Sequence, residues 1–213
     1  METQDLIDLL AMDAAPVKLT ATAWRFVFAL GAGALGATLI MLRLLGLRAD
    51  IADAALVPMF WIKLWFVACI AASGLVAATR LARPGARVAP AAALLAGALL
   101  VVWGLAAWTL VEAGASARAG LVLGKSWGQA PFNIALLSIP ALAAAFWALN
   151  GLAPTRLSRS GAAAGLFAGG IGAIAYSFHC DEMTAPFIGI WYPAGVLLPV
   201  AAGAVLGPVL LRW

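Results

Sequence analysis

The chain has 213 residues, of which 65% are hydrophobic and only 10% are charged, and its formal net charge is +4. Soluble domains carry about 25% charged residues, so this composition excludes an ordinary soluble protein. The apolar residues also fall in runs close to the roughly 20 residues that a helix needs to cross a bilayer.

Six apolar runs predict the architecture of the chain. In chain order they cover residues 26–45, 57–79, 89–111, 131–152, 161–178 and 190–211, the last interrupted by Pro193, Pro199 and Pro208. They leave only a short head and short loops. We therefore expect an all-α membrane protein, a six-transmembrane-helix bundle over residues 24–213, preceded by a short cytoplasmic N-terminal amphipathic helix within residues 1–23.

The head, residues 1–23, combines leucines at helical spacing with four acidic residues. An acidic amphipathic helix is repelled by anionic lipid and better suits docking to a basic protein. A capping helix packed on the bundle is the alternative interpretation. The candidate residues for binding a partner are Asp5, Leu6, Asp8, Leu9, Leu10 and Asp13.

Lys63 lies about two turns into the second predicted span, between Trp61 and Trp65. Long basic side chains in such positions extend toward the membrane interface. We expect Lys63 to reach the outer interface in this way. The alternative is an ion pair with Asp53 or Glu112.

Gly161, Gly165 and Gly169 repeat every four residues along the fifth predicted span. Small residues one helical turn apart allow the backbone of another helix to approach closely. Packing within the bundle is the main interpretation of this pattern. A homodimer seam is the alternative.

The single histidine and one of the two cysteines are adjacent at the end of the fifth predicted span, as His179 and Cys180, and Asp181 and Glu182 follow. Thiolate and imidazole suit Zn²⁺ and other soft divalent ions. Adjacent residues rarely converge on one ion, so a metal site here would be open, shared with Glu112, or completed by a second subunit. A solvated turn after a helix and a stimulus-sensing site both fit these four residues.

The basic residues predict the orientation in the membrane. Cytoplasmic loops are enriched in Lys and Arg, and the two compact basic loops run from Arg80 to Arg87 and from Arg156 to Arg159. We expect a protein of the bacterial inner membrane with both termini in the cytoplasm and Cys180 on the outer face. The positive charge then faces the lipid bilayer, and direct nucleic-acid binding is not expected.

Catalytic signatures are missing from the sequence: it has no HExxH, P-loop, GxSxG or paired CxxC motif. No acidic residue lies deep in a predicted span, where proton- and cation-coupled transporters usually need one. We therefore expect a protein that is not an enzyme and requires no cofactor, with a divalent metal ion at most as a signal.

Several segments are distinctive when they are taken together: TQDLIDLLAMDAAPV in the head, LGKSW before the fourth span, the stretch ending in YSFHCDEM, then WYPAG and the terminal GPVLLRW. Together they resemble the NrsF-like family of bacterial inner-membrane anti-sigma factors. The resemblance runs over essentially the whole chain. It implies a six-span protein that sequesters an extracytoplasmic-function (ECF) sigma factor at the membrane. Release would follow metal or oxidative stress, with outer cysteines as the sensor.

Residue by residue, Cys180 matches the family's cysteine after the fifth span, and His179 and Glu182 match its neighbours. The family tends to place a second cysteine just after the tryptophan that opens the fourth span, whereas Gly128 follows Trp127 here. With one outer thiol we expect metal ligation, oxidation or an intermolecular disulfide and no internal bridge. The alternative function is a small redox or metal-handling or transport membrane protein.

Overall fold

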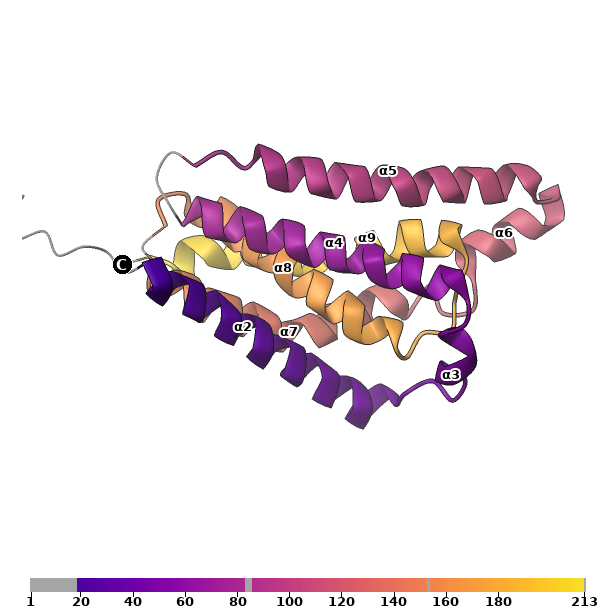
Figure 1. Ribbon diagram of the computed structural model, residues 1–213, viewed down its shortest axis with the longest axis horizontal. Coiled ribbons are helices and arrows are strands. Elements are labelled where there is room, and N and C mark those ends of the chain that lie inside the picture. The colour runs from indigo at the N-terminus through magenta and orange to yellow at the C-terminus, as the bar shows by residue number, and fades with distance from the viewer. Residues whose placement is uncertain (1–18, 83–85, 153, 213) are drawn as a thin grey trace, which may run out of the picture.

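The computed structural model describes residues 19–82, 86–152 and 154–212, and in these ranges the regular structure is entirely helical (Figure 1). The elements are α2 (Leu19–Ile40), its π-helical continuation η1 (Met41–Leu45), α3 (Ile51–Ala54), α4 (Pro58–Leu81), α5 (Ala89–Glu112), α6 (Ala115–Leu123), α7 (Ala130–Asn150), α8 (Leu157–Ser177) and α9 (Ala185–Leu210). The six long helices run along a common direction. The short helices α3 and α6 are both at the same end of the bundle.

Five segments of this bundle are long and apolar enough to cross a membrane: Ala23–Leu45, Pro58–Leu81, Ala89–Glu112, Ala130–Asn150 and Ala185–Leu210. They confirm five of the six predicted spans to within a few residues. The last predicted span forms one helix, α9, which is continuous through its three internal prolines. A proline removes only one donor, and neighbouring helices can compensate for the lost bond.

The remaining predicted span corresponds to α8, which has 21 residues but a less apolar sequence. It packs against α2, α4, α7 and α9, so most of its side chains are buried between helices. A helix enclosed by protein needs small residues for close packing more than it needs lipid-facing apolar bulk. Its glycine content therefore lowers its hydropathy without removing it from the bundle.

The three glycines of the predicted packing stripe face α9 of the same chain. A Cβ atom on Gly161 would collide with the carbonyl oxygen of Gly203, and one on Gly165 would collide with the carbonyl of Pro199. A Cβ on Gly169 would lie 2.9 Å from side-chain carbons of Pro199 and Val196. The α8 and α9 backbones are thus in direct contact along this stripe.

Other glycines of α8 serve its remaining neighbours. A Cβ on Gly170 would lie 2.5 Å from the backbone of Ala71 in α4, and one on Gly172 would lie 2.6 Å from the carbonyl oxygen of Ile134 in α7. Three helices therefore approach α8 closely from different sides, and α8 is the packing centre of the bundle.

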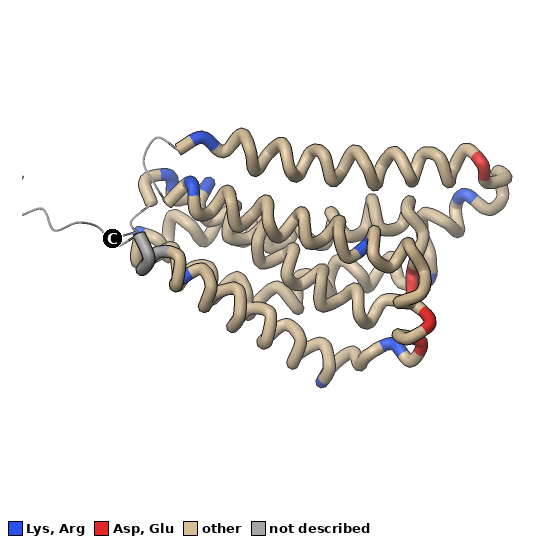
Figure 2. The backbone as a smooth tube through the Cα atoms, in the orientation of Figure 1, with Lys and Arg blue, Asp and Glu red and all other residues tan. Residues whose placement is uncertain are grey.

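Charged residues gather at the two ends of the bundle (Figure 2). The acidic residues in the described part of the chain all lie at the end of α3 and α6, where α4 begins and α5 ends. The opposite end, where α2 and α8 begin, carries arginines. The predicted head residues 1–18 fall outside the described ranges, and α2 already begins at Leu19.

The contact between α8 and α9 predicts the effect of one added methyl group. Gly165→Ala should lower the free energy of unfolding by about 1–3 kcal/mol, because it overpacks a backbone contact. Gly97→Ala in α5 is the matched control, since a Cβ there would meet nothing within 4 Å. Thermal unfolding in detergent should separate the two variants. Equal melting temperatures would contradict the close approach of α8 and α9.

Candidate functional site around Cys180

The segment between α8 and α9 lies at the acidic end of the bundle and carries all four predicted sensor residues. Its backbone turns sharply after α8, because the N–H groups of His179 and Cys180 both donate to the carbonyl of Tyr176, at 3.0 and 2.9 Å. Cys180 is only 3% exposed, whereas Asp181 is exposed. The thiol predicted to face the outside is thus enclosed by protein.

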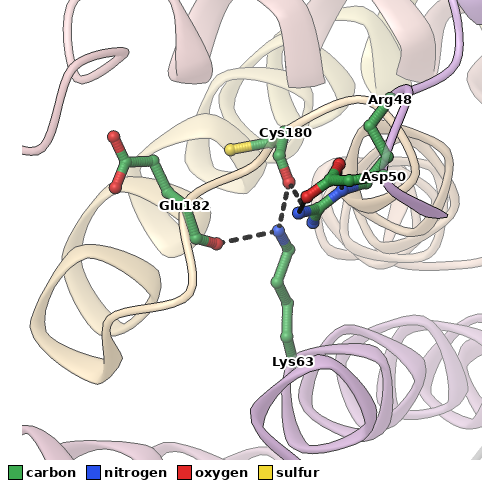
Figure 3. A network of polar contacts seen from close by, with 5 residues as sticks. All are labelled: Arg48, Asp50, Lys63, Cys180 and Glu182. Atoms are coloured by element: carbon green, nitrogen blue, oxygen red, sulfur yellow. Dashed lines mark hydrogen bonds and ion pairs between the residues drawn. The ribbon is translucent and has the colours of Figure 1, made fainter. Parts of the chain in front are cut away.

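Lys63 of α4 holds this segment from below (Figure 3). Its ammonium group is fully buried and donates to the carbonyl oxygens of Cys180 and Glu182, at 2.9 and 3.0 Å. It also lies 5.4 Å from the centre of the Tyr192 ring, within range of a cation–π interaction. Two carbonyls and an aromatic face together replace the water that the charge has lost.

The structure contradicts the ion-pair interpretation of Lys63, because its partners are main-chain carbonyls, not Asp53 or Glu112. Its ammonium group is buried in protein, at the carbonyls of the segment after α8. Within the described ranges the one ion pair joins Arg48 and Asp50. Sequence spacing places Lys63 on a helix face, but which segment covers that face depends on how the helices pack.

Arg48 approaches the same carbonyl from the other side. Its Nη1 donates to the Cys180 oxygen at 3.3 Å, and its Nε and Nη2 both donate to the Asp50 carboxylate at 2.8 Å. Its backbone N–H donates to the carbonyl of Phe178 at 3.1 Å. The side-chain hydrogen bonds between Arg48 and Asp50 lower the pKa of Asp50 and raise the pKa of Arg48. Two cations, one from α4 and one from the loop between η1 and α3, thus converge on the backbone of Cys180.

The side chains of the four predicted sensor residues point to different partners. His179 Nδ1 lies 3.0 Å from the carbonyl oxygen of Gly46, so this nitrogen carries the proton and donates. The sulfur of Cys180 lies 3.8 Å from Oγ of Ser126. Among the residues that the structure describes, no three His, Cys, Asp or Glu side chains are grouped to hold a metal ion. The four residues do not fit a ready-made metal site, and their sensing role stays a prediction.

The LGKSW segment packs directly against the sensor segment. Gly124 has a φ of +56°, which favours glycine, and it brings the N–H of Lys125 to 2.6 Å from the Glu182 carboxylate. Ser126 then contacts Cys180, and the ring centroids of Trp127 and Trp191 lie 5.4 Å apart. Segments far apart in the sequence therefore build one site.

A pocket of about 320 Å³ opens beside the thiol. Its wall is polar and includes Arg48, Ser126, Gln129, Tyr176, His179 and Cys180. A small reagent or ion can reach this space, although Cys180 as a whole is only 3% exposed. Metal ligation, oxidation and an intermolecular disulfide at this thiol stay predictions.

Arg48, Lys63 and Ser126 are site residues that the sequence analysis did not assign to the sensor. One signal was available for Lys63, because an ionisable residue inside a span is a functional candidate by default. Nothing in the sequence connects Arg48 or Ser126 with Cys180. The predicted partner-binding residues Asp5, Leu6, Asp8, Leu9, Leu10 and Asp13 lie outside the described residues and stay a prediction.

Lys63→Met tests whether the buried ammonium holds the Cys180 segment. The Glu182 carbonyl would lose its donor, at about 1–3 kcal/mol, and the Cys180 carbonyl would keep only the longer bond from Arg48. We expect a lower melting temperature and at least tenfold faster reaction of Cys180 with a small methanethiosulfonate, since 1.4 kcal/mol is a factor of ten.

Lys125→Met is the matched control, because Lys125 meets Glu182 through its backbone N–H alone. Both variants would carry Cys69→Ser, so that Cys180 is the only thiol that reacts. Equal reaction rates in the two proteins would show that Lys63 does not hold the segment.

Comparison with known proteins places the chain in a family. The model of the family described as negative regulator of sigma F matches residues 10–213. The probable anti-sigma-F factor NrsF of Azospira oryzae is 47% identical over 213 residues, and the anti-sigma-F factor NrsF of Caulobacter vibrioides is 39% identical over 216 residues. Both alignments cover 100% of each chain. No solved structure matches. The chain belongs to the NrsF family of negative regulators of sigma F.

Proposed function

We propose that the protein is a membrane-anchored anti-sigma factor that sequesters an ECF sigma factor at the inner membrane. It releases the factor when Cys180 reacts at the periplasmic face under metal or oxidative stress. The observation that carries the anti-sigma role is the full-length similarity to two relatives named anti-sigma-F factors. Lys63 and Arg48 both hold the backbone of Cys180, and this position supports Cys180 as the site of sensing.

The charge distribution supports the orientation in this proposal. Lys and Arg favour the cytoplasmic side. The arginines near the C-terminal end of α4 and the N-terminal end of α8 lie at the end of the bundle opposite the acidic one (Figure 2). We infer that α8 is the sixth span, because it packs beside α4, α7 and α9. Both termini then lie in the cytoplasm, and the Cys180 site lies in the periplasm.

The signal in this proposal is chemical modification of the thiol. Oxidation to a sulfenic acid adds a polar oxygen to a sulfur that is almost fully enclosed beside Ser126. The added group strains a segment whose backbone is held by Lys63 and Arg48. Because these side chains do not form a metal site, a thiophilic metal ion would act through the sulfur and would need ligands from elsewhere.

Transmission to the cytoplasmic side would run through α8. The helix begins at the arginine-rich end and ends at the Cys180 segment, a distance of about 31 Å for 21 residues at 1.5 Å each. Its glycines bring it into close contact with α4, α7 and α9. In other proteins, helices at interfaces shift by about 1–2 Å between two arrangements.

The acidic head is the element that we propose to bind the sigma factor. A sigma factor binds DNA through basic surfaces, so acidic residues such as Asp5 and Asp8 offer complementary charge. Leu6 and Leu10 offer an apolar anchor at helical spacing. Charge governs the encounter rate and its salt dependence, whereas buried apolar residues hold the complex.

Cys180→Ser should leave repression of the sigma factor intact and abolish its release by peroxide or a thiophilic metal. The serine keeps the backbone contacts of the site but lacks the reactive sulfur. Cys69→Ser is the control, because Cys69 lies within α4 away from the site. A promoter–reporter assay in intact cells measures both properties. Normal induction in the Cys180→Ser strain would remove the sensor role from this residue.

Leu6→Asp combined with Leu10→Asp should abolish sequestration, because charge replaces the apolar anchor. Asp5→Asn combined with Asp8→Asn should weaken binding less and flatten its salt dependence. Co-purification of the sigma factor with the detergent-solubilised protein measures both effects. If the leucine double variant still retains the sigma factor, the head is not the binding element.

A further inference from the structure

A second cavity lies at the arginine-rich end of the bundle, where α4 ends and α8 begins. It is a groove of about 440 Å³ between α4, α5, α8 and α9. Small side chains such as Ala77, Ala91 and Ala162 line it, and they leave the space between the helices unfilled. Arg156 and Arg159 stand at its rim.

The groove extends well below the ends of the helices. Its wall includes Ser73, eight residues before the end of α4, and Leu197, thirteen residues before the end of α9. These positions lie about 12 and 20 Å along their helices at 1.5 Å per residue. The Ser73 hydroxyl donates to the carbonyl of Ala91 at 2.6 Å and offers no free polar group. The depth of the groove therefore suits an apolar chain.

The rim has the opposite character. Arg156 and Arg159 are exposed, and the acidic residues in the described ranges all lie at the other end of the bundle (Figure 2). Arg80 and Arg87 are sequence neighbours of the groove residues Leu81 and Val88. The Arg80 side chain donates to the Arg87 carbonyl at 2.9 Å. The free N–H groups of the first turn of α8 also favour an anion at this place.

We propose that this groove binds an anionic phospholipid. One acyl chain lies between α5 and the α8–α9 pair, and the phosphate contacts Arg156 and Arg159. An apolar tail with an anionic head matches both the apolar wall and the basic rim. Basic pockets between membrane helices on the cytoplasmic side are established lipid sites in other proteins. The proposal requires only that the bundle lies in a membrane, and it is independent of the anti-sigma role.

The acidic head of the chain is a less suitable occupant. Its charge would complement the arginines, but Asp5, Asp8 and Asp13 recur along its length. A helix with this pattern would cover the mouth of the groove and would not fill a depth reached by Leu197. The lipid tail carries no charge into this depth.

Native mass spectrometry of the full chain tests the proposal. The protein, purified in mild detergent, is incubated with equal amounts of dioleoyl-phosphatidylglycerol and dioleoyl-phosphatidylcholine. We expect it to retain the anionic lipid preferentially and to keep it in excess inorganic phosphate. Arg156→Gln with Arg159→Gln should weaken this binding about thirtyfold, as follows from about 1 kcal/mol per basic residue. Arg43→Gln with Arg118→Gln, at the other end, should not weaken it.

A second pair of variants tests the groove itself. Ala162→Leu fills the groove and should reduce lipid retention, whereas Ala96→Leu, on an exposed part of α5, should leave it unchanged. Circular dichroism and gel filtration verify that each variant is folded.

Three results would overturn the proposal. One is equal retention of the two lipids by the wild type, and another is unchanged preference after loss of both arginines. The third is anionic lipid binding that emerges only in Leu6→Asp with Leu10→Asp, which would identify the head as the occupant of the groove.

Discussion

A single buried ammonium group determines how one end of this bundle is built. Lys63 is 0% exposed in α4 and has no carboxylate partner among the described residues, so dipoles stabilise its charge. The carbonyls of Cys180 and Glu182 supply them, and this requires the segment after α8 to fold back over α4. Losing these contacts would leave an uncompensated buried charge, which costs about 3–5 kcal/mol in measured cases. The conformation around the thiol follows from this requirement.

The other contacts at this end support the same segment. Arg48 reaches the Cys180 carbonyl from the loop after η1, and the carbonyl of Gly46 in the same loop accepts a hydrogen bond from His179. The turn at Gly124 brings a backbone N–H to Glu182. Cys180 is thus held through its backbone by groups from several elements, while its sulfur borders a small polar pocket. This arrangement suits a cysteine whose chemical modification would displace the backbone segment that carries it.

Hydropathy predicted most of the helices because lipid-facing residues must be apolar over about 20 positions. The apolar run at residues 161–178 predicted α8 as well, but α8 is less apolar than the other long helices, since a helix enclosed by four others is rich in small residues. The site was predictable only at Cys180 and its neighbours, which are rare residue types placed side by side. The contributions of Lys63 and Arg48 depend on the helix packing and on the path of the chain, and no local pattern encodes either. The close packing of Gly161, Gly165 and Gly169 was visible in the sequence, but their partner α9 was not.

The central claim is that chemistry at Cys180 is transmitted along α8 to the opposite end of the bundle. Amide hydrogen exchange, measured by mass spectrometry before and after peroxide treatment, tests it directly. We expect faster exchange in residues 178–184 together with the first turns of α8 near Leu157, and no change in the Cys180→Ser protein. Faster exchange confined to residues 178–184 would contradict transmission through α8.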